Sequence, residues 1–170
     1  TNTARSIPVL VHALDWLKDN ENESYDYVMI LQPTSPFRTS KDIDSCIKLA
    51  VDNNADSVMS MVEVPDFHPA KLKKIEANLI TSLLEKEKGQ SAMKHELKEV
   101  YRRNCAIYLT KTGLVMKNDL FGKFSVPYIM PPERSIDING KFEFIVADLI
   151  MKEFKKKNFS YKSWLKEIKN

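Results

Sequence analysis

The sequence predicts an α/β domain built on a mostly parallel β-sheet. Two apolar runs with strand character, residues 27–31 and 57–64, are separated by a polar loop and a helical pattern that begins near Thr39. A strand, a helix and a second strand in this order form a unit whose strands normally run parallel. With 170 residues, of which 43% are hydrophobic and 29% charged, the chain is long enough for one core, so residues 1–170 are predicted to form a single domain.

The helices follow from apolar residues that recur every three or four positions. Ser6 and Pro8 suit the start of the first helix, Thr39 or Ser40 caps the second, and the third follows Gly140. A short fourth helix is predicted within residues 161–168. The apolar faces of the first three are Ile7, Leu10, Val11, Leu14 and Leu17; Ile43, Cys46, Ile47, Ala50 and Val51; and Phe142, Ile145, Val146, Leu149, Ile150 and Phe154.

The middle of the chain departs from the strand–helix alternation. Residues 70–75 and 79–84 predict a small antiparallel hairpin. The charged segment 85–99 has weak periodicity and indicates either an excursion that makes subunit contacts or a plain surface loop. Strands are then expected at 105–110 and 125–130, with a short helix or turn at 112–118. Pro127 predicts that the last strand is irregular or lies at the sheet edge.

Composition excludes several classes of function. The formal charge of +3 is too small to indicate nucleic-acid binding, and no apolar run approaches the ~20 residues of a membrane span. Cys46 and Cys105 make no disulfide framework, so a reducing, cytoplasmic setting is the default expectation. Cys46 lies on an apolar helical face, which indicates a core thiol. No Ser/His/Asp or Cys/His spacing points to covalent catalysis.

Three polar segments fall at predicted strand ends: residues 32–38, 101–104 and 134–139. Loops at one edge of an α/β sheet commonly share a ligand cleft, so we expect these segments to converge. Asp137 is the best candidate ligand for a hard cation, although its position alone favours a turn or helix-capping role. Asn139 offers a carbonyl oxygen without charge. Arg102 and Arg103 each suit anion binding or an exposed surface equally well.

In their order along the chain and in their residues, four stretches of the sequence resemble motifs of the acylneuraminate cytidylyltransferase (CMP-sialic acid synthetase) family. Residues 32–38, QPTSPFR, are similar to the family's QPTSPLR loop, and residues 67–69 to its His-Pro turn. Residues 102–108, RRNCAIY, resemble RxNGAIY, and residues 135–139, SIDIN, resemble SIDID. The resemblance implies a three-layer, Rossmann-like nucleotidyltransferase fold and a homodimer in which residues 64–103 form a dimerisation arm.

The resemblance also implies the reaction and its residues. The family transfers CMP from CTP to a nonulosonic (sialic-type) acid with Mg²⁺ and releases pyrophosphate. Asp137 is the implied catalytic residue, and the implied metal ligands are Asp137 and Asn139. Gln32 and Asn104 are expected to bind the sugar, and Tyr108 and Phe121 to line its N-acyl pocket. The full set of expected substrate-binding residues is Gln32, Thr34, Ser35, Arg38, Lys94, Arg102, Asn104, Tyr108 and Phe121. For Arg38, support of the loop fits as well as ligand contact.

Four positions depart from the family pattern. Asn139 replaces a metal-binding aspartate, and Lys94 stands near the place of an arginine that binds the sugar carboxylate. Cys105 replaces the glycine before AIY, and Gly122 stands where a second pocket aromatic can occur. These differences suggest a sugar related to N-acetylneuraminate but not necessarily identical with it.

The family's phosphate-holding loop, PARxGSKxxxxKN, does not occur in this sequence. We therefore expect an N-terminally truncated form of the fold that lacks ordinary synthetase activity by itself. A non-catalytic sugar-acid-binding or dimerisation module derived from the same fold is the alternative, which Asn139 and the missing loop favour.

Overall fold

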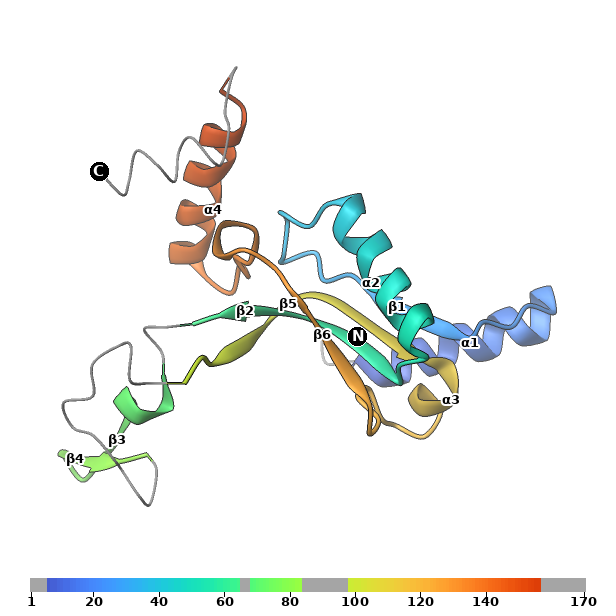
Figure 1. Ribbon diagram of the computed structural model, residues 1–170, viewed down its shortest axis with the longest axis horizontal. Coiled ribbons are helices and arrows are strands. Elements are labelled where there is room, and N and C mark those ends of the chain that lie inside the picture. The colour runs from blue at the N-terminus through green and yellow to red at the C-terminus, as the bar shows by residue number, and fades with distance from the viewer. Residues whose placement is uncertain (1–5, 65–67, 84–97, 157–170) are drawn as a thin grey trace.

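A computed structural model describes residues 6–64, 68–83 and 98–156, and its centre is a four-stranded sheet (Figure 1). The strands are β1 (Tyr27–Ile30), β5 (Tyr101–Lys111), β2 (Ser57–Glu63) and β6 (Ser125–Ile129), in that spatial order. The α/β class is confirmed.

The prediction of a mostly parallel sheet is wrong. The long strand β5 lies between β1 and β2 and runs antiparallel to both, while only β2 and β6 form a parallel pair among the described strands. β1 and β2 do point the same way, as the strand–helix–strand pattern predicts, but they are second neighbours. Apolar runs report burial and carry no information about strand direction, so the insertion of β5 was not visible in the pattern.

The predicted helices are present as α1 (Ser6–Glu21), α2 (Ser40–Asn53) and α4 (Lys141–Phe154), with the short α3 (Thr112–Val115) after β5. Helical turns η2 (Pro69–Lys71) and η4 (Pro132–Arg134) precede the hairpin and the last polar segment. The predicted strand 125–130 is the edge strand β6 and contains Pro127, as expected. The predicted terminal helix, residues 161–168, lies outside the described residues.

The predicted hairpin is formed by β3 (Lys73–Glu76) and β4 (Leu79–Ser82). Ile75 faces Ile80 across the pair, and the hairpin projects from one end of the molecule, away from the four-stranded sheet (Figure 1). Most of the predicted excursion at 85–99 lies outside the described residues.

The core lies between α2 and one face of the sheet. Cys46 and Ala50 of α2 pack with Val58, Ile107 and Leu109 of the central strands, and all five are at most 4% exposed. Burial, helped by the charge of Asp42, raises the pKa of the Cys46 thiol to about 12. The thiol therefore stays protonated at neutral pH, which confirms the predicted core role.

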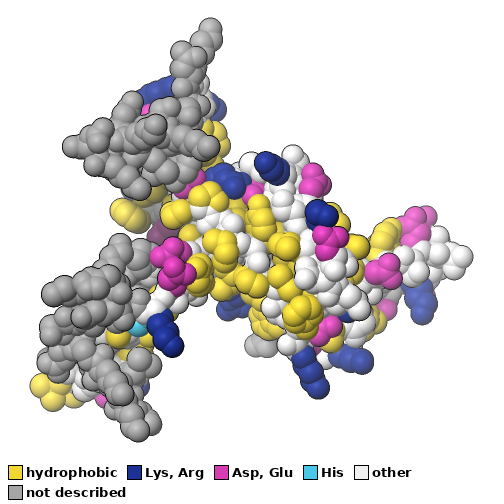
Figure 2. Space-filling model, in the orientation of Figure 1, with side chains coloured by type: hydrophobic (Ala, Val, Ile, Leu, Met, Phe, Trp, Pro, Cys, Tyr) yellow, Lys and Arg dark blue, Asp and Glu magenta, His cyan; other side chains and the backbone are white. Residues whose placement is uncertain are grey.

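Periodicity predicted α4 correctly but not its burial. Phe142 is 73% exposed and Leu149 is 57% exposed, and only Ala147 of this helix is buried. Hydrophobic side chains are also visible over the central body on the face shown in Figure 2. An apolar stripe records that a face is suited to burial, and the described residues leave much of this one uncovered.

Candidate functional site

Hydrogen bonds join the three polar segments that the sequence singles out. The Ser35 hydroxyl donates to the Asn104 carbonyl at 3.2 Å, and the Asn104 amide donates to the Ser135 hydroxyl at 2.9 Å. The backbone N–H of Ile138 donates to the Thr34 carbonyl at 2.8 Å. The antiparallel direction of β5 explains this meeting, because it brings the amino end of β5 to the carboxyl ends of β1 and β2.

A bulge of several residues in β5 shapes the site. Met59 of β2 pairs with Tyr108 and Met61 with Arg103, so residues 104–107 stand opposite Ser60 alone. The Ser60 hydroxyl accepts from the Ile107 N–H at 2.8 Å and donates to the Asn104 side chain at 2.5 Å. Since paired residues share a face of the sheet, the bulge places Tyr108 and Arg103 on the same face, the one away from α2.

Asn104 is fully buried and its amide is committed within the protein. Its oxygen accepts from the Ser60 hydroxyl and the Ala106 N–H, and its nitrogen donates to Ser135 and to the Met130 sulfur. Such a satisfied buried amide holds two segments in register. In this structure Asn104 therefore supports the site rather than facing an open cleft.

The loop at residues 32–38 is likewise anchored. The Arg38 guanidinium donates to the carbonyls of Gln32 at 3.2 Å and Ala106 at 2.7 Å, which ties the loop to β5. Ser35 is 1% exposed. Gln32, Thr34 and Arg38 are half-buried, and the Arg38 guanidinium is committed to these two carbonyls, so Gln32 and Thr34 are the better candidates of this loop for contact with a ligand.

Asp137 has the chemistry of a cation ligand. One carboxylate oxygen, Oδ2, accepts from the Asn139 amide at 3.0 Å, while Oδ1 is buried without a hydrogen-bond partner among the described residues. Burial acts to raise the pKa of Asp137, but the polar side chains of Thr34, Asn139 and Cys105 and the charge of Arg102 outweigh it, so the pKa lies below its ordinary value. The carboxylate is thus an anion with one unsatisfied oxygen.

The capping alternative for Asp137 does not hold, because Gly140 is the N-cap of α4 and no side chain caps that helix. A hard cation such as Mg²⁺ fits the oxygen donors of Asp137 and Asn139. Within the described part of the chain, no group of three or more His, Cys, Asp or Glu side chains is arranged to hold a metal.

Tyr108 lies on the sheet face that carries the hollow beside Phe121, but it does not line that hollow. Met59, the partner of Tyr108, lines a hollow of about 480 Å³ together with Phe121 and Arg103. The Tyr108 hydroxyl donates to the Cys105 sulfur at 3.3 Å. Burial, followed by this contact, raises the pKa of Tyr108 to about 12, so the hydroxyl remains a donor at neutral pH.

The two remaining residues of the expected substrate-binding set are Arg102 and Lys94. Arg102 is exposed, and its guanidinium donates to the carbonyls of Ser135 and Arg103, each at 3.3 Å. Lys94 lies outside the described residues.

Sequence reasoning missed the supports of the last polar segment. Asp42 is 1% exposed, accepts from the Tyr128 hydroxyl at 2.9 Å and forms an ion pair with Arg134. Asp42 also forms a capping box with Thr39, whose Thr-x-x-Asp spacing was the available sequence signal. The sequence placed Arg134 in the last polar segment but did not indicate its ion pair with Asp42, which fixes η4 and so the start of the segment that holds Asp137.

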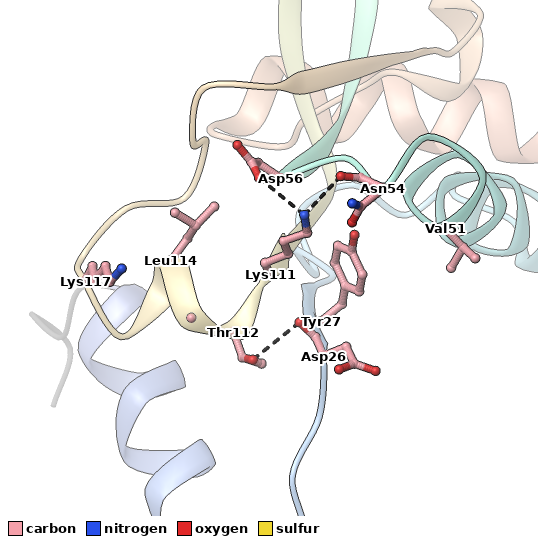
Figure 3. A pocket seen from close by; sticks show the side chains of 10 residues that line it. Asp26, Tyr27, Val51, Asn54, Asp56, Lys111, Thr112, Leu114 and Lys117 are labelled. Atoms are coloured by element: carbon pink, nitrogen blue, oxygen red, sulfur yellow. Dashed lines mark hydrogen bonds and ion pairs between the residues drawn. The ribbon is translucent and has the colours of Figure 1, made fainter.

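A hollow of about 620 Å³ lies at the opposite edge of the sheet and has a different character (Figure 3). The Lys111 ammonium donates to the Asn54 carbonyl at 3.0 Å and lies 3.4 Å from an Asp56 oxygen. The Tyr27 hydroxyl donates to the Ala55 carbonyl at 2.7 Å. Because these polar groups bond to one another, they hold the ends of neighbouring elements together, and we do not take this hollow as the candidate site.

Within residues 6–64, 68–83 and 98–156, no helix is both long and apolar enough to cross a membrane. No protein-family model matches the chain.

Curated relatives agree with the motif resemblance. The chain is 25% identical over 158 residues to "Post-translational flagellin modification protein B" of Campylobacter coli, covering 90% of this chain and 64% of that protein. It is 28% identical over 155 residues to an N-acylneuraminate cytidylyltransferase of Escherichia coli, covering 90% of this chain and 35% of that protein. A Streptococcus agalactiae N-acylneuraminate cytidylyltransferase is 27% identical over 135 residues, covering 77% of this chain and 32% of that protein.

The chain thus spans between about one third and two thirds of the length of these relatives. With the motifs, these similarities make the chain a relative of the acylneuraminate cytidylyltransferase (CMP-sialic acid synthetase) family.

Proposed function

We propose that this chain supplies the sugar-acid side of a site that transfers CMP from CTP to a nonulosonic acid and releases pyrophosphate. The observation that carries the proposal is the meeting of residues 32–38, the bulged start of β5 and residues 135–139 around the Asp137 carboxylate. Relatives named as N-acylneuraminate cytidylyltransferases support the same reaction class.

The accessible and the buried side chains take different roles in this proposal. Gln32 and Thr34 hydrogen-bond the sugar, and Tyr108 and Phe121 receive its acyl substituent. Ser35, Arg38 and Asn104 act as positioning residues, because their polar groups already hold the loop and β5 together. The positive charges of Arg102 and Lys94 attract the anionic substrates.

In the reaction, the anomeric oxygen of the sugar acid forms a bond to the α-phosphorus of CTP. The bond from that phosphorus to the oxygen bridging to the β-phosphate breaks, and pyrophosphate leaves with the bonding electrons. Asp137 accepts a hydrogen bond from the anomeric hydroxyl and orients it; its lowered pKa makes it a weak base, so the hydroxyl proton passes on to solvent. Asp137 and Asn139 would hold Mg²⁺, which when bound neutralises phosphate charge.

The nucleotide side of the site is not assigned to the described residues, since none of them forms a phosphate-holding loop of the family's type. Titration calorimetry of this chain with N-acetylneuraminate therefore tests the part of the proposal that the chain itself carries. We expect saturable binding that strengthens with MgCl₂. Asp137→Asn should weaken it roughly tenfold, because the neutral amide loses a charge-assisted contact.

Asp148→Asn is the matched control, because this aspartate lies on α4 and pairs only with Lys152 at the surface. No binding of the sugar acid would contradict the proposal. Binding that ignores both MgCl₂ and Asp137→Asn would instead favour a non-catalytic sugar-acid-binding module. That second candidate draws support from the absence of a three-residue metal cluster in the described part of the chain.

A further inference from the structure

Arg103 is a cation on the candidate-site face that the reaction outlined above does not use. It lies on β5 opposite Met61, is exposed, and forms no ion pair with an acidic side chain of the described residues. Its guanidinium carbon is 5.7 Å from the centre of the Phe121 ring. Stacking of this kind restrains the guanidinium and leaves the N–H groups at its edge free to donate.

The hollow beside Arg103 is mostly apolar. Its wall combines two methionines of β2, the Phe121 ring and residues of β6, and encloses about 480 Å³. The full lining is Met59, Met61, Arg103, Phe121, Ser125, Val126 and Pro127. The Ser125 hydroxyl already forms a hydrogen bond with the Ser57 hydroxyl at 2.8 Å. The Arg103 guanidinium is therefore the main polar group of this lining that can hydrogen-bond a ligand.

An apolar hollow with one donor group at its edge suits a short alkyl chain attached to a hydrogen-bond acceptor. The acylamino substituent of a nonulosonic acid has this form, since its alkyl end is apolar and its carbonyl oxygen is an acceptor. Met side chains adapt to groups of different shape, so the hollow tolerates different alkyl ends.

We propose that Arg103 is a specificity-determining residue that donates to the acyl carbonyl of an N-acylated nonulosonic acid whose alkyl end occupies the hollow between Met59, Met61 and Phe121. This inference rests on the proposed function. It adds to it a reason for selecting acylated sugar acids over those with a hydroxyl at the same carbon. The β5 bulge is what makes it feasible, because residues 103 and 108 share a face only across that bulge.

The test compares two ligands on the full chain by titration calorimetry. One is N-acetylneuraminate, and the other is the nonulosonic acid with a hydroxyl in place of the acylamino group. In Arg103→Ala, affinity for the acylated ligand should fall roughly tenfold while affinity for the hydroxyl ligand stays within about twofold. Arg103→Lys should recover only part of the loss, because it keeps the charge but not the planar fork.

Lys117→Ala is the control: it removes a cation beside the opposite hollow and should leave both affinities unchanged. Equal weakening of both ligands by Arg103→Ala would assign Arg103 to a group that they share, such as the carboxylate, and would overturn the inference. Unchanged selectivity would overturn it as well. Wild-type protein that binds neither ligand would contradict the proposed function itself. Melting temperatures of the variants show whether each is folded.

Discussion

At the scale of single residues, the motifs identify which positions come together but not which contacts their side chains make. The family resemblance correctly gathered Thr34, Asn104 and Asp137 into one region, and the structure joins their segments by hydrogen bonds. It did not reveal that the Asn104 amide is committed within the protein, because a motif gives residue types and not hydrogen-bond partners. For Arg38, the structure favours the loop-supporting role over ligand contact. The sequence marked Arg103 as a possible anion-binding residue, but its place beside Phe121 could not be predicted because it depends on the bulge.

Cys105 shows the physical reason for a glycine in the family pattern. Its φ is +62°, in the left-handed region where a side chain costs roughly 1–2 kcal/mol and glycine costs none. Cys105→Gly should therefore raise the free energy of unfolding by about 1 kcal/mol, after the loss of the weak contact with Tyr108. Urea unfolding measures this. A destabilisation of similar size would show that the thiol contacts outweigh the backbone strain.

The backbone at Gly122 gives a structural reason for glycine at this position that does not involve the sugar. Its φ is +67°, and a Cβ there would lie 2.5 Å from the Asp56 Cβ and 2.8 Å from Leu114 Cδ1. Any side chain on this backbone would therefore meet Asp56 and not the hollow lined by Phe121. Sequence comparison alone has no access to that direction.

Gly122→Ala should destabilise the protein by at least about 2 kcal/mol, from the left-handed backbone and the short contacts together. Gly113→Ala is its control, because no heavy atom lies within 4 Å of a Cβ at that position in α3, and alanine favours a helix. Urea unfolding of both variants gives the comparison. Equal losses at the two positions would be inconsistent with this reading.

At the scale of elements, period and capping signals predicted where helices and strands lie, and strand direction was the principal error. The three long helices and the hairpin follow from patterns that local physics creates. The antiparallel β5 depends on how the chain returns after the hairpin, which is a long-range property. That error matters for function, because the reversed strand is what delivers Asn104 to the loop at residues 32–38.

Asp42 links α2, β6 and η4, so its replacement tests how elements hold the site. Burial acts to raise its pKa, but hydrogen bonds from Thr39, Arg134 and Tyr128 outweigh it and the pKa is lowered. The stability that this carboxylate contributes is therefore present above the ordinary value of 3.8 and is lost as pH falls through the folded-state pKa.

Asp42→Asn should cost roughly 3 kcal/mol near neutral pH, because Arg134 loses its partner. It should also flatten the fall in stability below about pH 4. Urea unfolding from about pH 2.5 to about pH 7, a range that spans the titration of the carboxylate, measures both effects. Asp44→Asn, on the exposed side of the same helix, is the control and should change stability by less than about 0.5 kcal/mol. A flat pH response in wild-type protein would rule out this role for Asp42.

At the scale of the whole molecule, we propose a homodimer formed through the arm at residues 64–103. Within the described part of the arm, Ile75 is 78% exposed and its cross-strand partner Ile80 is 75% exposed. Two neighbouring isoleucines on a projecting hairpin suit contact with the same hairpin of a second copy.

Ile80→Glu should therefore shift the protein from dimer to monomer in sedimentation velocity, because a charge would be buried at the contact. Lys74→Ala changes a residue that neighbours Ile75 but faces the other side of the hairpin, and it should leave the dimer intact. A wild-type monomer at every concentration, or a dimer unaffected by Ile80→Glu, would refute the proposed interface.

The most direct test of the central claim is to map where a sugar acid binds, using backbone amide shifts of the ¹⁵N-labelled chain titrated with N-acetylneuraminate. We expect saturable shifts around Thr34, Tyr108, Phe121 and Asp137, close to where the three polar segments meet. Amides beside the opposite hollow, such as Lys111, should stay unshifted. Absent shifts, or shifts confined to that opposite edge, would contradict the claim that this chain carries the sugar-acid side of the site.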